Sequence, residues 1–134
     1  MENQFVPYEE TKKLIELGFD EPTLAHYITT TNVRGRNSLI LSGVFRKKDK
    51  RDLSILSAPL YQQAFNFFRE HYSTNCEIIC EKYPDLFGYT IEDYNGKLIC
   101  CMLGSSYNEV RLQCLETTIN TIQTRILMEN NLNK

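Results

Sequence analysis

The sequence lacks the short motifs that identify most enzymes and metal proteins. It contains no H-x-x-x-H, no paired-cysteine zinc spacing, no G-x-S-x-G, no D-x-D loop and no Walker sequence. Only two histidines are present, and a nucleophile with its base would need His71 beside Cys76 or Cys80. His26 stands alone in its segment and is interpreted as a structural residue. We therefore predict a protein that is not an enzyme and that uses no metal or cofactor.

A long apolar run is absent as well. Residues 1–4 are acidic and polar, so the sequence predicts neither a signal peptide nor a membrane span, and we expect a cytoplasmic protein. A chain of 134 residues that is 42% hydrophobic fits one domain with one core. We predict a single domain over 1–129, with a variable basic loop at about 32–52, and a frayed tail at 130–134.

Cysteine spacing gives no disulfide framework. The five cysteines are an odd number and include no C-x-x-C pair. Since no secretion signal is predicted, they are interpreted as reduced residues of the core. They are Cys76, Cys80, Cys100, Cys101 and Cys114.

One basic stretch stands out from an acidic chain. The net charge is −2, but residues 34–51 hold seven cations and one anion, so this stretch carries +6 and the remainder −8. Such a stretch can bind phosphate groups, or it can be a solvated loop. Two arginines flank Gly35, which lets a ligand approach the backbone. The predicted ligand contacts are Arg34, Arg36, Arg46, Lys47, Lys48, Lys50 and Arg51, with Tyr61 and Arg69 from the helix that follows.

Residues 57–72 are predicted to form a central buried helix. Ser57 can cap its first turn, and Pro59 lies where a missing N–H costs nothing. Its aromatic residues recur at helical spacing, which predicts one broad buried face. That face consists of Leu60, Tyr61, Ala64, Phe65, Phe67, Phe68 and Tyr72.

The remaining pattern predicts an α+β fold. A first helix begins near Pro7 and ends at Gly18. Strands are predicted at 24–31, around 39–45, and at 76–81. Asn95-Gly96 predicts a two-residue type I′ turn between strands 87–94 and 97–102, with Phe87, Tyr89 and Ile91 facing the central helix. We expect a small antiparallel sheet of three to five strands packed by three helices.

The last predicted helix is the longest. Residues 106–109 have the S-x-x-E form of a capping box, and an apolar stripe follows at 3-4 spacing. The stripe is expected to pack on the sheet, while residues 122–127 could instead contact a second copy of the chain. Its members are Leu112, Leu115, Ile119, Ile122 and Ile126.

Several segments resemble a group of small uncharacterised bacteriophage and prophage proteins. The resemblance covers most of the chain outside roughly 29–56, and departs from the group at His71, where lysine is frequent, and at Asn108, where glutamate is. It is carried by F-V-P-Y-E at 5–9, L-G-F-D-E-P at 17–22, A-P-L-Y-Q-Q-A-F at 58–65, F-F-R-E-H-Y at 67–72 and Y-N-E at 107–109.

The resemblance implies a phage accessory protein in the cytoplasm of a bacterial host. Together with the basic stretch and the aromatic helix, it suggests a homo-oligomeric counter-defence sponge, which would sequester an anionic nucleotide-type immune signal without cleaving it. Two alternatives stay open. The chain could be a protein-binding inhibitor of a host defence protein, using a strand edge or the basic loop, or a nucleic-acid-binding accessory protein.

Overall fold

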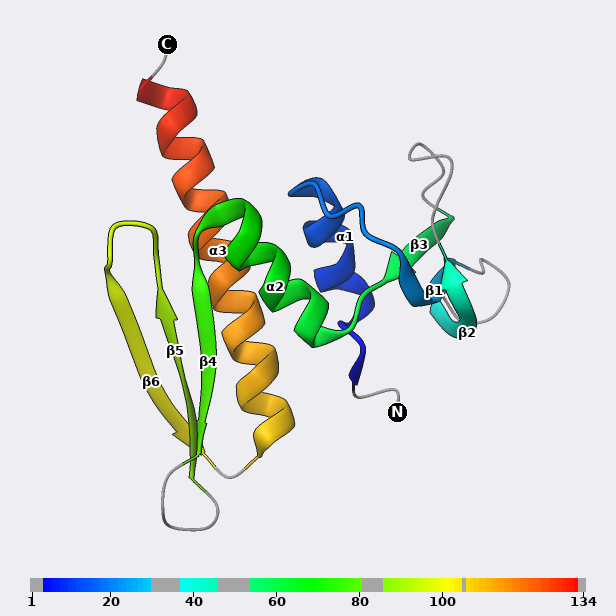
Figure 1. Ribbon diagram of the computed structural model, residues 1–134, viewed down its shortest axis with the longest axis horizontal. Coiled ribbons are helices and arrows are strands. Elements are labelled where there is room, and N and C mark those ends of the chain that lie inside the picture. The colour runs from blue at the N-terminus through cyan, green and yellow to red at the C-terminus, as the bar shows by residue number, and fades with distance from the viewer. Residues whose placement is uncertain (1–3, 30–36, 46–53, 81–85, 105, 133–134) are drawn as a thin grey trace. The chain divides into compact units, whose positions relative to one another are not determined.

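A computed structural model describes residues 4–29, 37–45, 54–80, 86–104 and 106–132 (Figure 1). The predicted α+β class is confirmed, but the strands form two three-stranded antiparallel sheets where one sheet was expected. The elements are α1 (Tyr8–Glu16), β1 (Thr23–Thr29), β2 (Asn37–Phe45), β3 (Ile55–Ala58), α2 (Tyr61–Tyr72), β4 (Asn75–Cys80), β5 (Phe87–Glu92), β6 (Leu98–Gly104) and α3 (Tyr107–Leu132).

The chain divides into two compact units, residues 1–64 and 65–134, and the boundary falls inside α2. Each unit contains one of the sheets. The single domain over 1–129 therefore stays a prediction. None of the helices in the described ranges combines the length and the apolar character that a membrane crossing requires.

In the first unit, α1 begins and ends where the sequence indicates. Pro7 occupies the N-cap position, and two glutamates lie in the first turn, where the helix dipole favours negative charge. At the other end, the N–H of Gly18 donates to the carbonyl of Ile15 and that of Phe19 to the carbonyl of Leu14, both at 3.0 Å. This is a Schellman motif, and Gly18 supplies its left-handed residue with a φ of +105°.

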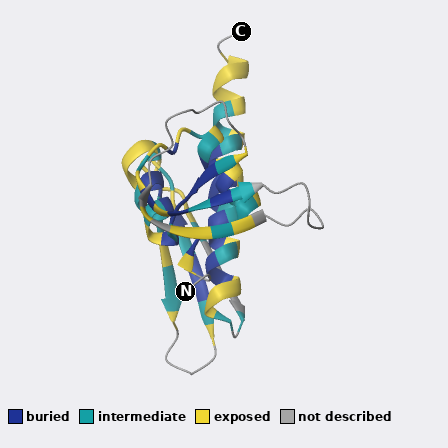
Figure 2. Ribbon diagram, turned by 90° about the vertical axis from the view of Figure 1, so that its right-hand side faces the viewer, coloured by how far each residue is buried: buried dark blue, intermediate teal, exposed yellow. Residues whose placement is uncertain are grey.

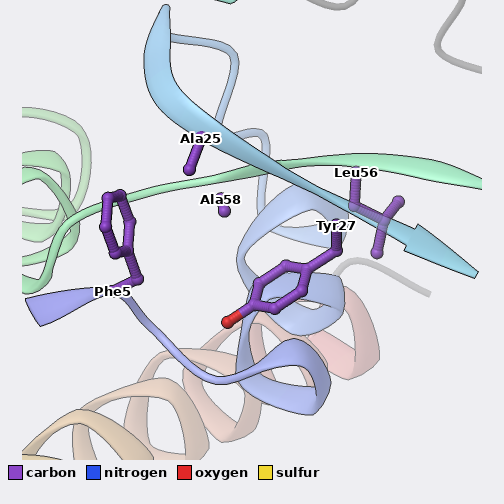
Figure 3. Packing of buried hydrophobic residues seen from close by; sticks show 5 residues of the cluster. All are labelled: Phe5, Ala25, Tyr27, Leu56 and Ala58. Carbon is purple, nitrogen blue, oxygen red and sulfur yellow. The ribbon is translucent and has the colours of Figure 1, made fainter. Parts of the chain in front are cut away.

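The first sheet has the order β2-β1-β3, so β1 is paired on both sides. Tyr27 pairs with Leu39 of β2 and with Leu56 of β3, which places these side chains on one face. The Tyr27 hydroxyl donates to the carbonyl of Val6 at 2.6 Å, and its ring meets that of Tyr8 edge-on. Figure 3 shows the resulting core of Phe5, Ala25, Tyr27, Leu56 and Ala58.

The predicted start of the central helix is wrong. Ser57 is a buried residue of β3, paired with His26, and does not cap α2. The strand continues to Ala58 because Leu56 and Ala58 fill the core of the first unit. The helix starts after Leu60, whose N–H donates to the side-chain carbonyl of Gln63 at 3.0 Å. That contact is one half of a capping box.

In the second unit, the predicted hairpin is confirmed, but its two-residue turn is wrong. Glu92 pairs with Leu98, so residues 93–97 form the connection. The N–H of Gly96 donates to the carbonyl of Asp93 at 2.9 Å, and Gly96 has a φ of +78°. These features define a type I turn with a G1 bulge. The Asp93 carboxylate stabilises the longer turn by accepting from two backbone N–H groups, each at 2.9 Å.

The second sheet, with the order β4-β5-β6, packs mainly on α3 (Figure 1). Tyr89 and Ile91 form a buried cluster with Val110 and Cys114 of α3, and α2 adds only Phe65 to it. The central helix was predicted to be the main partner of this face, and that prediction is wrong because the face packs mainly on α3. The reason is that the apolar stripe of α3 is longer and covers more of the sheet.

The capping box of α3 is partly confirmed, because the Ser106 hydroxyl accepts from the N–H of Glu109 at 3.3 Å. Figure 2 shows that the last turns of α3 are exposed. Residues 130–132, assigned to a frayed tail, are helical. Ile122 is fully buried within the chain, so a contact between copies at 122–127 cannot use it, whereas Leu127 is 63% exposed.

Replacing Gly18 by alanine tests the Schellman motif. No atom stands in the way of an added Cβ, so the cost comes from the positive φ alone. We expect Gly18→Ala to lower the free energy of unfolding by about 1–2 kcal/mol in urea titrations. Glu16→Ala, an exposed site two residues earlier, should change it by less than about 0.5 kcal/mol. Equal losses of stability in the two variants would contradict the assignment of a Schellman motif at Gly18.

Candidate functional site

The seven cations predicted to contact a ligand lie outside the described residues, but the strand ends that flank them are described. Arg36 directly precedes Asn37, which pairs with Thr29 at the end of β1. Arg51 is followed four residues later by Ile55, which pairs with Ile28. Because Thr29 and Ile28 are neighbours, β2 and β3 begin at the same end of the first sheet, whereas β2 ends at Phe45, which pairs with Thr23 at the opposite end of β1.

This sheet offers no negative charge of its own. The strands β1, β2 and β3 contain no aspartate or glutamate. The described carboxylates of the first unit all belong to α1 or to the turn after it. They are Glu9, Glu10, Glu16, Asp20 and Glu21. Within the described residues, the first sheet therefore contributes no carboxylate that would offset the positive charge of residues 34–51.

The two helix residues predicted as ligand contacts, Tyr61 and Arg69, lie within the described residues. Tyr61 is only 6% exposed and belongs to the core, so its ring offers little surface to a ligand. Arg69 is exposed, and its guanidinium donates to the side-chain carbonyl of Asn66 on the same helix. Tyr61 and Arg69 belong to different units.

The structure gathers one cation and two rings that the sequence did not connect. The guanidinium carbon of Arg125 lies 4.6 Å from the ring centroid of Tyr94 and 5.7 Å from that of Tyr72. Arg125 also donates to the main-chain carbonyl of Tyr72 at 3.2 Å. It thereby joins α3 to the end of α2 and to the β5–β6 turn. These contacts account for Arg125 as a structural residue of the second unit.

Two cysteines meet between β4 and α3. Cys114 lies in the buried cluster of the second unit, and the half-buried Cys76 packs against it. The sulfur of Cys76 is 3.2 Å from the hydroxyl oxygen of Thr118, and this hydroxyl can also donate to the carbonyl of Cys114 at 2.7 Å. Sequence reasoning placed both cysteines in the core but did not pair them. The only sequence feature that could have suggested the contact is the position of Cys114 on the buried side of its helix.

The two thiols differ in acidity because one donates to the other. A hydrogen bond from Cys114 lowers the pKa of Cys76, and the Thr118 hydroxyl lowers it further, while burial opposes both. The same bond raises the pKa of Cys114, and burial raises it again. Cys76 is thus the more acidic thiol of the pair, and Cys114 is the donor of the hydrogen bond between them.

The alternative pairing of Cys76 with a histidine is not formed. The neighbours of the Cys76 sulfur are Thr118 and Cys114, and the ring of His71 packs on Phe67 with centroids 4.9 Å apart. Among the described residues, no group of three or more histidine, cysteine, aspartate or glutamate side chains could hold a metal ion.

Comparisons with protein-family models, with curated proteins and with solved structures find no match to the chain. The resemblance to phage accessory proteins therefore stays a prediction. Two features of the chain bear on function, the basic stretch at 34–51 and the thiol pair of the second unit.

Removing the Thr118 hydroxyl should raise the pKa of Cys76. We expect Thr118→Val to shift the pH profile of iodoacetamide alkylation at Cys76 to higher pH, measured by peptide mass spectrometry. Its stability cost should be about 1 kcal/mol, the usual net worth of one hydrogen bond.

Thr121→Val is the matched control for this substitution. Like the Thr118 hydroxyl, the Thr121 hydroxyl donates to the main-chain carbonyl four residues earlier on the same helix, that of Thr117, at 2.8 Å. We expect it to leave the alkylation profile of Cys76 unchanged. An identical shift in both variants would show that Thr118 does not act on the sulfur directly.

Proposed function

We propose that this chain is a non-enzymatic phage accessory protein that sequesters an anionic nucleotide-type signal in the cytoplasm of a bacterial host. The observation that carries the proposal is the +6 charge of residues 34–51, a stretch that contains β2 and belongs to a sheet whose three strands hold no carboxylate. Phosphate groups are the ligand class that such a concentration of arginine and lysine recognises best.

The charge distribution favours a ligand that binds at one site over a ligand that binds across much of the surface. The +6 stretch at 34–51 contrasts with −8 on the remainder of the chain, so a long polyanion would be repelled over most of the surface. A small ligand with a few phosphates needs only the basic stretch. This contrast favours a nucleotide-type ligand over a nucleic acid.

A sequestering protein returns its ligand unchanged, and that property distinguishes it from an enzyme. Sequestration also benefits from several binding sites per particle, which is why we propose a homo-oligomer. Tyr61 is left out of the proposed contacts because it is buried. Ligand recognition then rests on Arg34, Arg36, Arg46, Lys47, Lys48, Lys50 and Arg51.

Charge reversal at the first basic segment tests this proposal. Native mass spectrometry with a panel of cyclic oligonucleotides and ADP-ribose derivatives should show a bound ligand that is released intact on denaturation. We expect Arg34→Glu combined with Arg36→Glu to weaken the binding of that ligand at least about tenfold, because each lost charge-assisted contact is worth roughly 1.5–3 kcal/mol.

The control reverses two cations of the same unit outside the basic stretch. Lys12→Glu with Lys13→Glu changes the net charge equally, on exposed positions of α1. It should leave the affinity within about twofold, because these lysines are not among the proposed ligand contacts and salt screens charges on exposed side chains. Equal losses of affinity in both variants would show that the effect comes from the net charge alone. A wild-type protein that stays ligand-free across the panel would overturn the proposal.

A second candidate function is binding to a partner protein through the edge of β2. This strand has nine residues, none of them charged, and lies at the edge of the first sheet. Leu41 and Ile40 are 59% and 38% exposed. Edge strands usually carry a charge or proline against unwanted pairing, and an edge without either is suited to strand addition by a host defence protein.

A charge placed on this edge should abolish strand addition. If a host polypeptide co-purifies with the chain, we expect Leu41→Lys to remove it, read by affinity purification and mass spectrometry. Leu24→Lys is the matched control, because Leu24 is 49% exposed but lies in the central strand. Retention of the partner by Leu41→Lys would exclude the β2 edge as its binding site.

A further inference from the structure

The second unit contains a chemical site that the proposed function does not use. Cys76 comes from β4 and Cys114 from α3, and both belong to the same compact unit, so their contact is independent of the first unit. Cys76 packs against the buried cluster that contains Cys114, and its sulfur contacts Thr118, one helical turn after Cys114, at 3.2 Å. Packing of the two cysteines into one cluster lets their sulfurs react with one another when one of them is activated.

Their surroundings assign a different step to each sulfur. Cys76 is half-buried and so can meet a small oxidant, while Cys114 is fully buried behind it. The Thr118 hydroxyl contacts the Cys76 sulfur and can turn its proton toward a thiolate there. Cys114 keeps its proton until an adjacent electrophile forms.

We propose that Cys76 and Cys114 are a redox-active thiol pair, which hydrogen peroxide converts into an intramolecular disulfide. The Cys76 thiolate attacks one peroxide oxygen, the O–O bond breaks, and the departing hydroxide takes a proton to become water. The sulfur of Cys114 then attacks the sulfenic sulfur of Cys76. The S–S bond forms, the S–O bond breaks, and the second hydroxide leaves as water with the proton of Cys114. Both sulfurs are oxidised by one electron each, and the peroxide is reduced to two water molecules.

The disulfide would connect an edge strand to the helix that covers its sheet. β4 is at the edge of the second sheet and α3 provides the buried side of the cluster. A covalent link across this packing contact restricts the unfolded chain between residues 76 and 114. The oxidised protein is therefore expected to resist unfolding at higher denaturant concentration than the reduced protein.

Peptide mapping of the peroxide-treated full-length protein tests the proposal. Remaining thiols are blocked, and the digest is analysed by mass spectrometry without reduction. We expect a peptide linked through Cys76 and Cys114 that disappears on treatment with dithiothreitol. It should form at least about tenfold faster in the folded protein than in guanidinium chloride, because folding holds the two sulfurs together.

Cys80→Ser is the matched control, since Cys80 is an exposed cysteine of the same strand. This variant should form the linked peptide at the wild-type rate. In Cys114→Ser, Cys76 should stop at the sulfenic acid and be trapped by dimedone. Because Cys114 is buried and this variant could fail to fold, the wild-type peptide map alone decides. Linkage of Cys76 to Cys80, Cys100 or Cys101, linkage between chains, or oxidation of Cys76 that leaves Cys114 a thiol would overturn the proposal.

Discussion

A three-stranded sheet is stable in water only when one of its faces is covered, and this constraint decides the architecture of both units. In the first unit, the alternation of side chains along β1 puts Ala25 and Tyr27 on the covered face, and the Tyr27 hydroxyl fixes the segment before α1 through the carbonyl of Val6. In the second unit, α3 covers the sheet with Val110 and Cys114. The covering contacts also determine which side chains remain available for chemistry.

The two units leave their reactive groups in different places for the same reason. β1 is paired on both sides, so the chain reaches its flanking strands only through the connections, and those connections hold the cations. Charged side chains are expensive to bury, which keeps them out of the sheet itself. A thiol is a small, weakly polar group, so Cys114 can belong to the buried cluster and still be a reactant.

Patterns among neighbouring residues predicted most of the elements. The predictions that failed concern residues whose structure depends on partners far away in the sequence. The end of α1 at Gly18, the strand at β4 and the Ser106 cap follow from neighbouring residues. Ser57 looked equally suitable as a helix cap, but its pairing with His26 placed it in a strand. Asn95-Gly96 favours a short turn, and the carboxylate of Asp93 stabilised a longer one. The meeting of Cys76 with Cys114 has no local signal, because it depends on how α3 packs on the sheet.

The two candidate sites depend on different physical variables, which makes them separable. Binding of phosphate groups by exposed arginine and lysine weakens as salt is added, because screening acts on charges in solvent. The reaction of Cys76 depends on a hydrogen bond from a buried thiol, and such a contact is shielded from mobile ions. When both thiols are protonated, the reduced protein and its disulfide form have the same formal charge. On the two proposals, ionic strength acts on ligand binding at the basic stretch and oxidant acts on the thiol pair, and neither variable requires a change in the other site.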